Sequence, residues 1–143
     1  MAIPESARKV IDSGRLVHFV TVNRDGSPQV SIVWAGTDGD DVVMAHFGEY
    51  RKVKNVRRDP RVSLSIETDS VNAQGLTEYL VVHGTARIVE GGAAELLQKL
   101  AYIYIGPDVG KFPPGDAPMP AGYVTRITPT RFSGVGPWAG ARA

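Results

Sequence analysis

The sequence predicts a small, mainly β protein, an antiparallel barrel of about six strands with two or three short helices. Apolar and polar residues alternate with the period of a strand in several short segments. Hairpin-type turns separate the first of these segments, and helical spacing is confined to short stretches. Because the chain has 143 residues and no break in composition, we expect one domain spanning residues 1–143.

The first third of the chain predicts a short helix followed by three strands. Ala7 and Ile11 share one face of that helix, and Gly14 is placed to end it in a left-handed conformation. Turns at 23–26 and 37–40 join the strands, the first being Asn-Arg-Asp-Gly. The three strands are expected over Arg15–Val22, Pro28–Trp34 and Asp41–Phe47. Because both turns are short, we expect these strands to pair consecutively as a meander.

The rest of the chain predicts two strands, a helix, an irregular loop and a final strand. These are expected over Arg61–Glu67, Leu76–Val89, Gly91–Ile105, Gly106–Gly122 and Tyr123–Thr130, respectively. Residues 68–75 are polar and predict a loop. Gly84, inside the long strand, predicts a bulge or a close approach of two backbones. Proline and glycine exclude regular structure in 106–122, which is therefore an ordered loop or a mobile flap.

The most distinctive segment is the basic stretch Tyr50–Pro60, which follows a predicted strand. If it is helical, one face is polar and mostly basic, formed by Arg51, Lys54, Asn55 and Arg58 at positions i, i+3, i+4 and i+7. A helix N-terminus with basic side chains beside it is suited to hold a phosphate. The alternative is a solvated surface helix with excess charge.

Composition restricts the possible partners and compartments. Sixteen Lys and Arg residues face fifteen Asp and Glu residues, yet six of the sixteen cations lie between Arg51 and Arg61. This local charge favours a discrete anionic ligand over nucleic acid. The chain has no cysteine, which excludes thiolate catalysis and is typical of a reducing compartment. We expect a cytoplasmic protein with neither nucleic-acid nor membrane partners, since no apolar run has the length of a membrane span.

No side-chain constellation points to catalysis by the protein alone. The three histidines, His18, His46 and His83, lie on separate strands without ligand spacing, so no metal site is predicted. Nucleophile-elbow, Walker and dinucleotide-binding motifs are absent from the sequence. A phosphate corner without a catalytic side chain favours a bound redox cofactor that carries the chemistry. An apolar slot for its ring could be formed by Val33, Trp34, Met44 and Ala45, although ordinary core packing explains the same four residues.

The order of these motifs resembles that of one family. An Asn-Arg-Asp-Gly turn is followed by Pro28–Trp34, then Arg51-Lys52-x-x-Asn55 and Asp59-Pro60-Arg61-Val62, then His83-Gly84-Thr85-Ala86 and Gly136-Pro137-Trp138. Together they resemble the split β-barrel flavoproteins related to pyridoxamine phosphate oxidase. More narrowly, they are similar to the actinobacterial branch that uses the deazaflavin coenzyme F420. The resemblance covers nearly the whole chain.

The resemblance implies a homodimer of split barrels with two cofactor sites at the interface. Arg51, Lys52 and Asn55 would hold the cofactor phosphate and its acidic tail. The ring pocket would be lined by Gln29, Ser31, Val33, Trp34, Met44, Ala45 and His46. The other subunit would complete each site, with Trp138 as the candidate side chain. The basic cluster matches the phosphate and glutamates of the deazaflavin tail in sign, whereas FMN ends in one phosphate.

The function implied is reduction of a conjugated small-molecule acceptor by hydride from the reduced deazaflavin, with solvent or Tyr50 supplying any proton. One alternative is an FMN-dependent oxidase or reductase with the same fold. Another is a non-enzymatic protein that binds a cofactor or a tetrapyrrole such as haem. Pyridoxamine oxidation itself is disfavoured, because the C-terminal end lacks the further basic and aromatic residues of those oxidases. We expect acceptor choice to depend on 106–122 and the C-terminal tail.

Overall fold

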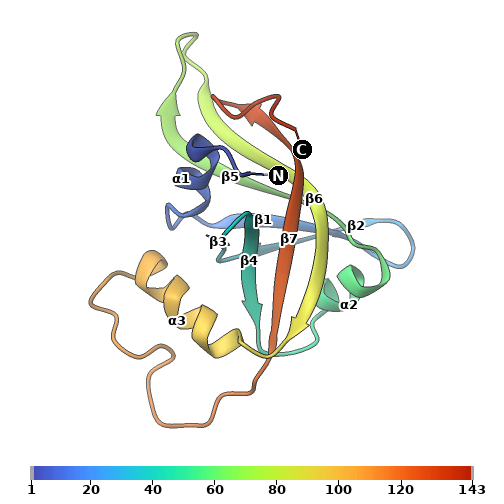
Figure 1. Cartoon of the computed structure of the whole chain (residues 1–143), viewed down its shortest axis with the longest axis vertical. Helices are drawn as coiled ribbons and strands as arrows, with labels where there is room; N and C mark the ends of the chain where they lie inside the picture. The colour runs from blue at the N-terminus through green and yellow to red at the C-terminus, as the bar shows by residue number, and fades with distance from the viewer. Residues whose placement is uncertain (1, 143) are drawn as a thin grey trace.

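The computed structural model describes residues 2–142 as one antiparallel sheet with three helices around it (Figure 1). The helices are α1 (Glu5–Ile11), α2 (Arg51–Arg58) and α3 (Ala93–Tyr104). The strands are β1 (Val17–Val22), β2 (Pro28–Val33), β3 (Gly36–Asp38), β4 (Asp41–His46), β5 (Arg61–Val71), β6 (Thr77–Glu90) and β7 (Tyr123–Val135). Among the described residues, no helix is both long and apolar enough to cross a bilayer.

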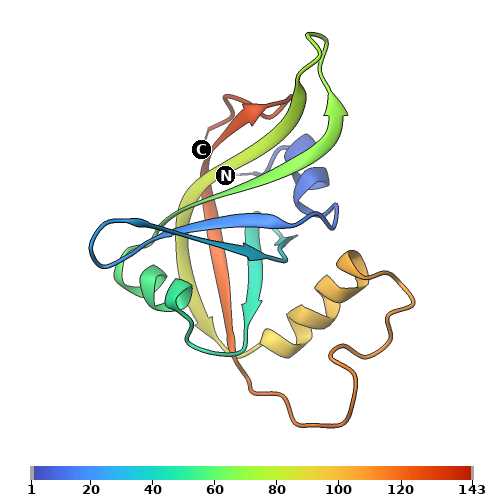
Figure 2. The same ribbon diagram turned by 180° about the vertical axis from the view of Figure 1, so that it is seen from behind.

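The sheet is strongly bent but not closed. Its strands follow the order β2-β1-β5-β6-β7-β4-β3, so that β2 and β3 form the two edges. Figure 2 shows the β1–β2 hairpin running across β4, β6 and β7 on the other side of the bend. The fold is therefore the predicted split barrel, with seven strands in place of about six. The additional strand, β3, is only three residues long and lies where we expected a turn.

The predicted meander is wrong for its third strand. β1 pairs with β2 as expected, but β4 pairs with β7 and β3 at the opposite edge of the sheet. The chain turns away from β2 at Ala35, which is fully buried. The Tyr104 hydroxyl replaces strand partners there, accepting from the Ala35 N–H at 3.0 Å and lying 3.2 Å from its carbonyl oxygen. With its backbone groups satisfied in this way, the chain can leave one edge and join the other.

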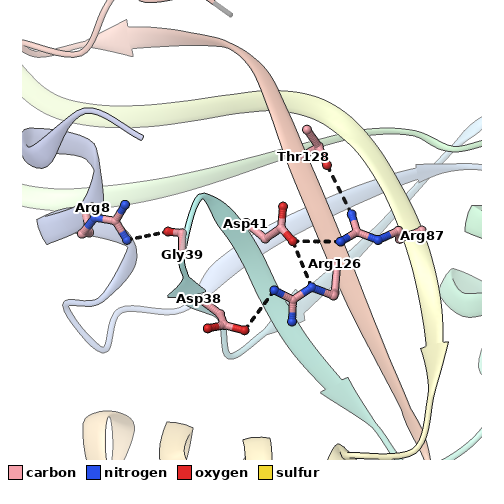
Figure 3. A network of polar contacts seen from close by, with 7 residues as sticks. All are labelled: Arg8, Asp38, Gly39, Asp41, Arg87, Arg126 and Thr128. Carbon is pink, nitrogen blue, oxygen red and sulfur yellow. Dashed lines mark hydrogen bonds and ion pairs between the residues drawn. The ribbon is translucent and has the colours of Figure 1, made fainter. Parts of the chain in front are cut away.

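An ion-pair network holds the β3–β4 hairpin beside β7 (Figure 3). Arg126 of β7 contacts Asp41 and Asp38, each at 2.9 Å, and Arg87 of β6 contacts Asp41 at 3.0 Å. Arg8 of α1 donates to a carbonyl in the turn of this hairpin at 2.8 Å. Three separate elements thus hold β3 and β4 beside β7.

The lengths of the strands also differ from prediction. β5 continues to Val71 and β6 begins at Thr77, so most of the predicted loop 68–75 belongs to a protruding hairpin. β7 continues to Val135 instead of ending at Thr130. The prediction for Gly84 is confirmed, because the β6–β7 register shifts there and a Cβ atom would overlap the Thr128 carbonyl oxygen. An antiparallel strand pair can carry polar residues where it faces solvent. The polar composition of 68–75 therefore did not distinguish an exposed hairpin from a loop.

The core lies on the inner face of the bent sheet. Its largest fully buried side chains include Phe19, Phe132, Leu64, Ile66 and Leu80. On β5, buried Val62, Leu64 and Ile66 alternate with more exposed residues, as the sequence predicts. The helix α2 packs against β1 and β6, and α3 packs against β4 and β7. This arrangement leaves a pocket between the ends of β2 and β4.

Candidate functional site

The pocket lies where the two halves of the open barrel face each other. Its volume is about 420 Å³, within the usual range for small-molecule sites. Most of its lining comes from four parts of the chain: the end of β2, the end of β4, the first turn of α2, and α3 with the loop that follows it. The lining residues are Leu16, Ile32, Val33, Trp34, Ala45, His46, Phe47, Tyr50, Lys52, Leu97, Leu100 and Phe112.

The first turn of α2 gives this apolar pocket a positive end. Tyr50 is the N-cap, and no side-chain hydrogen bond caps the helix. The Tyr50 carbonyl oxygen accepts from the N–H groups of Val53 and Lys54, at 2.9 and 3.1 Å. Because the first N–H groups of a helix have no intrahelical partner, those of Arg51 and Lys52 remain suited to an anion. The sequence predicted a phosphate corner at this place.

The six cations between Arg51 and Arg61 divide into two groups of three. Arg57 pairs with Glu49 at 2.6 Å, Arg61 pairs with Asp59 at 2.7 Å, and Arg58 donates to the Val22 carbonyl oxygen. The other three, which lie at the N-terminal end of α2, form no ion pair within residues 2–142; they are Arg51, Lys52 and Lys54. Ion pairs therefore neutralise Arg57 and Arg61, and Arg58 is held by uncharged oxygen atoms. In the described chain, the cations at the end of the basic stretch near the pocket are not held in either way.

Lys52 is the free cation that lines the pocket. Its side chain is half-buried, and burial lowers the pKa of its ammonium group. The Nζ atom lies 5.4 Å from the centre of the Tyr50 ring, a cation–π distance. A cation partly removed from water without a carboxylate partner is stabilised when an anion binds beside it. Lys52 is therefore the best-placed side chain for an anionic group at the mouth of the pocket.

His46 is a buried neutral neighbour of Lys52. Its side chain is only 3% exposed, and Nε2 lies 2.8 Å from Oγ1 of buried Thr125 on β7. Burial, and secondarily the charge of Lys52, lower the pKa of His46 to about 4. The imidazole is consequently uncharged near pH 7 and can present a hydrogen-bond donor or acceptor without adding charge.

Asn55 has a different position from the one expected. Its amide is buried and donates to Thr21 Oγ1 at 3.0 Å and to Asn23 Oδ1 at 2.9 Å, while its own oxygen accepts from Arg58 at 3.3 Å. The predicted polar face of α2 thus turns partly inward, toward β1 and the β1–β2 turn. Asn55 anchors the helix that carries Lys52, and it is absent from the pocket lining.

The structure brings six of the twelve predicted site residues into one pocket. These are Val33, Trp34, Ala45, His46, Tyr50 and Lys52. Gln29 and Ser31 lie on the same face of β2 as Val33, opposite Thr21 and Phe19 of β1. Ser31 Oγ is buried and has no hydrogen-bond partner in the described part of the chain. Ser31 itself is not among the residues that line the pocket.

The remaining predicted residues do not line the pocket. Met44 is fully buried in the core, and Arg51 is exposed on α2 beside the pocket mouth. Trp138 is 3% exposed, and its indole N–H donates to the Tyr79 carbonyl oxygen at 3.3 Å at the far end of the sheet. Its ring also covers Gly136. Because these contacts bury Trp138 within its own subunit, it is not presented to the site of another one.

Sequence reasoning missed the apolar residues that reach the pocket from other elements. Leu97 and Leu100 come from α3, Phe112 comes from the loop 106–122, and Leu16 and Ile32 come from the β1–β2 hairpin. The apolar face of α3 was visible in the sequence, but its direction was not. Phe112 is the one large aromatic residue in a loop rich in proline and glycine, which is the only local signal that could have singled it out.

Comparison with known proteins identifies the family. The model of the pyridoxamine 5′-phosphate oxidase family matches residues 3–136, nearly the whole chain. The protein belongs to this family. The family resemblance inferred from the turn, the Arg51-Lys52-x-x-Asn55 motif and the small-residue strand is therefore confirmed. A search among curated proteins gave no match.

Solved structures share the family fold. An F420 reductase is 26% identical, with a TM-score of 0.71, and the match covers 92% of this chain and 98% of that one. A conserved hypothetical protein from Mycobacterium tuberculosis is 25% identical, with a TM-score of 0.71 and coverage of 94% and 85%. An FMN-binding protein from Syntrophomonas wolfei subsp. wolfei is 12% identical, with a TM-score of 0.66 and coverage of 92% and 85%. At that identity the last one shows the fold alone.

Proposed function

We propose that the protein is an oxidoreductase that uses reduced coenzyme F420 to transfer a hydride to a conjugated small-molecule acceptor. The observation that carries this proposal is the half-buried, unpaired Lys52 at the uncapped N-terminus of α2, at one end of an apolar pocket. The 26% identity to an F420 reductase supports the same cofactor. When bound, the reduced coenzyme would supply the hydride, and the protein would hold and shield both reactants.

The residues present fit a flat ring with a charged tail. Val33, Trp34 and Ala45 provide apolar surface for the ring. Lys52 and the free N–H groups of α2 would bind the phosphate. Arg51 and Lys54, both exposed, would meet the glutamates of the tail. Three free cations suit a tail with several negative charges better than the single phosphate of FMN.

The chain offers few proton donors in this pocket. His46, with a pKa of about 4, is unprotonated near neutral pH and therefore cannot donate as an imidazolium. The Tyr50 hydroxyl belongs to a side chain that is 53% exposed at the pocket mouth. We therefore assign any proton needed by the reduced acceptor to solvent or to Tyr50, as the sequence predicts.

We also propose that the protein acts as a homodimer. Leu16 and Ile32 are 56% and 50% exposed, and both line the pocket as well as a groove on the outer sheet face beside His18. Tyr79 of β6 extends this surface and is 42% exposed. A second copy covering this apolar strip would also close the pocket. Light scattering should give twice the mass of one chain, and Ile32→Glu should yield monomers; a wild-type monomer would refute this part of the proposal.

A fluorescence titration tests the cofactor. Oxidised F420 and FMN are titrated separately into the purified protein. Tight binding of F420 with weak binding of FMN is expected. Tight binding of FMN would leave the fold assignment unchanged but would identify FMN as the cofactor in place of F420. Binding of neither would refute the proposal. Binding of F420 without reduction of any quinone, enone or tetrapyrrole acceptor would favour a non-enzymatic carrier.

Two lysine variants show whether Lys52 carries the binding. Lys52→Met removes the half-buried cation, and Lys9→Met removes an exposed one on α1. A charged hydrogen bond contributes about 1.5–3 kcal/mol, so Lys52→Met should raise the dissociation constant of F420 at least about tenfold. Lys9→Met should leave it unchanged. Equal affinities of the wild type and Lys52→Met for F420 would show that the cofactor phosphate does not bind at Lys52.

A further inference from the structure

Three aromatic rings form a stack at one side of the pocket. Trp34 lies between Tyr104 and Phe112, with ring centres 5.0 Å and 5.6 Å apart and interplanar angles of 9° and 38°. Trp34 and Phe112 both line the pocket. The Tyr104 hydroxyl donates to the Arg15 carbonyl oxygen at 2.8 Å, which fixes the back of the stack. Phe112 is the layer that comes from the irregular loop.

Gln98 of α3 is what connects this loop to the rest of the molecule. Its Nε2 donates to the Gly110 carbonyl oxygen at 2.6 Å, and its Oε1 accepts from the Phe112 N–H at 2.8 Å. Within the described chain, these two bonds are the only hydrogen bonds from residues 110–120 to another segment. The remaining one, from Lys111 to Gly115, is internal to the loop.

The side chain of glutamine is well suited to this task. One amide group supplies both the donor and the acceptor, and the two bonded residues lie on either side of Lys111. Together they fix the backbone around Lys111, and so the direction in which Phe112 leaves the loop. The long loop, seen below α3 in Figure 2, would otherwise have little to define its position.

We infer that Gln98 is a positioning residue that holds Phe112 over Trp34, and that Phe112 selects flat, conjugated acceptors by stacking. The inference rests on the proposed function, because it assigns the acceptor side of the same pocket. Phe112 packs on Trp34 and also lines the pocket, and a planar conjugated molecule can stack against an aromatic ring. A small non-aromatic enone gains less from them. Neither Gln98 nor Phe112 forms a hydrogen bond with Lys52 or α2 in the described chain, so neither one holds the groups assigned to the cofactor phosphate.

The test compares Gln98→Ala with Lys99→Ala, a matched control at an exposed neighbouring position on the same helix. On the protein alone, trypsin cleavage after Lys111 and acrylamide quenching of tryptophan fluorescence measure whether the loop is held. Trp138 is buried in the core and contributes little to quenching. Kinetics with reduced F420 are then measured with naphthoquinone, which is planar, and cyclohexenone, which is not aromatic.

For Gln98→Ala we expect faster cleavage and stronger quenching, and a smaller change in the dissociation constant for F420 than in the KM for naphthoquinone. The KM for naphthoquinone should rise roughly three- to tenfold, the range of one aromatic contact, with kcat nearly unchanged. The KM for cyclohexenone should change less than twofold, and Lys99→Ala should match the wild type throughout. Gln98→Glu keeps the acceptor for Phe112 but loses the donor for Gly110, so its effects should be intermediate. Phe112→Leu should reproduce the change in KM.

Each of the other possible outcomes would refute a different part of the inference. Cleavage and quenching equal to the wild type would show that Gln98 does not hold the loop. A loosened loop with an unchanged KM for naphthoquinone would remove acceptor selection from Phe112 while leaving the proposed function intact. Failure of the wild type to bind F420 would instead refute the proposed function, and the role in acceptor selection with it.

Discussion

Acidification should destabilise the protein through His46, because this histidine is buried without charge. Its pKa is lowered from 6.5 to about 4, by burial first and by the charge of Lys52 second. A proton therefore binds the unfolded chain at a higher pH than it binds the folded one. The contribution of neutral His46 to the free energy of unfolding is fully present above about pH 6.5 and is lost as the pH falls toward 4. This direction is the reverse of that for a histidine paired with a carboxylate.

The size of the effect follows from the same two pKa values. At about 1.4 kcal/mol per pH unit, the separation between 6.5 and about 4 corresponds to roughly 3 kcal/mol of unfolding free energy. About 2 kcal/mol of this should be lost by pH 5. That is a large fraction of the stability of a typical domain, which is about 5–15 kcal/mol. Acid sensitivity in this pH range should thus be easy to measure.

Urea unfolding of the wild type and His46→Gln, at several pH values between about 7 and 5, isolates this contribution. Glutamine is neutral, and its amide can bond to the Thr125 hydroxyl. Carboxylates titrate equally in both proteins, so the difference between the two curves belongs to His46. The wild type should lose about 2 kcal/mol more than the variant between pH 7 and pH 5. Parallel curves, or a wild type that gains stability relative to the variant, would refute the reasoning.

Three further substitutions test the surroundings of the pocket. Lys52→Met should raise the pKa of His46 measured by NMR, but not to 6.5, because burial is the larger cause of its shift. An unchanged pKa would contradict the electrostatic effect of Lys52 on His46. Asn55→Ala should lower the free energy of unfolding by about 2–3 kcal/mol, because it removes one buried and one partly buried hydrogen bond. Lys54→Ala, at an exposed position, should change it by less than about 0.5 kcal/mol in the same urea experiment. Similar losses for both would mean that Asn55 does not anchor α2. Gly84→Ala should lower the free energy of unfolding by about 1–3 kcal/mol, because its methyl group would overlap a carbonyl oxygen of β7. An unchanged melting temperature would show that β6 and β7 can separate there.

The sequence predicted those features that depend on neighbouring residues. The Asp-Gly turn at 23–26, the alternation along β5 and the left-handed Gly14 were all recognisable, because turn chemistry and strand period are local. The positive N-terminal end of α2 was also recognisable from the spacing of Lys52 and its neighbours. Family motifs then added the split barrel, which periodicity alone could not have named.

The tertiary structure decided which distant groups meet. Short turns favoured a meander, yet β4 pairs with β7, far from β2 in the sheet. Tyr104, 69 residues away, satisfies the backbone at Ala35 where the chain leaves β2. Asn55 looked like part of a solvent-facing basic surface, but Thr21 and Asn23 supply buried partners that make an inward position favourable.

Two aromatic residues illustrate the same division. Trp138 was expected to reach a second subunit, and its own core buries it instead. Phe112 lies in a loop whose sequence predicts no conformation, and Gln98 of α3 gives it one. Sequence fixes the period and charge of each segment, since these are properties of adjacent residues. The partner of each buried polar group depends on which segments the fold brings within hydrogen-bonding distance, and only the tertiary structure determines that.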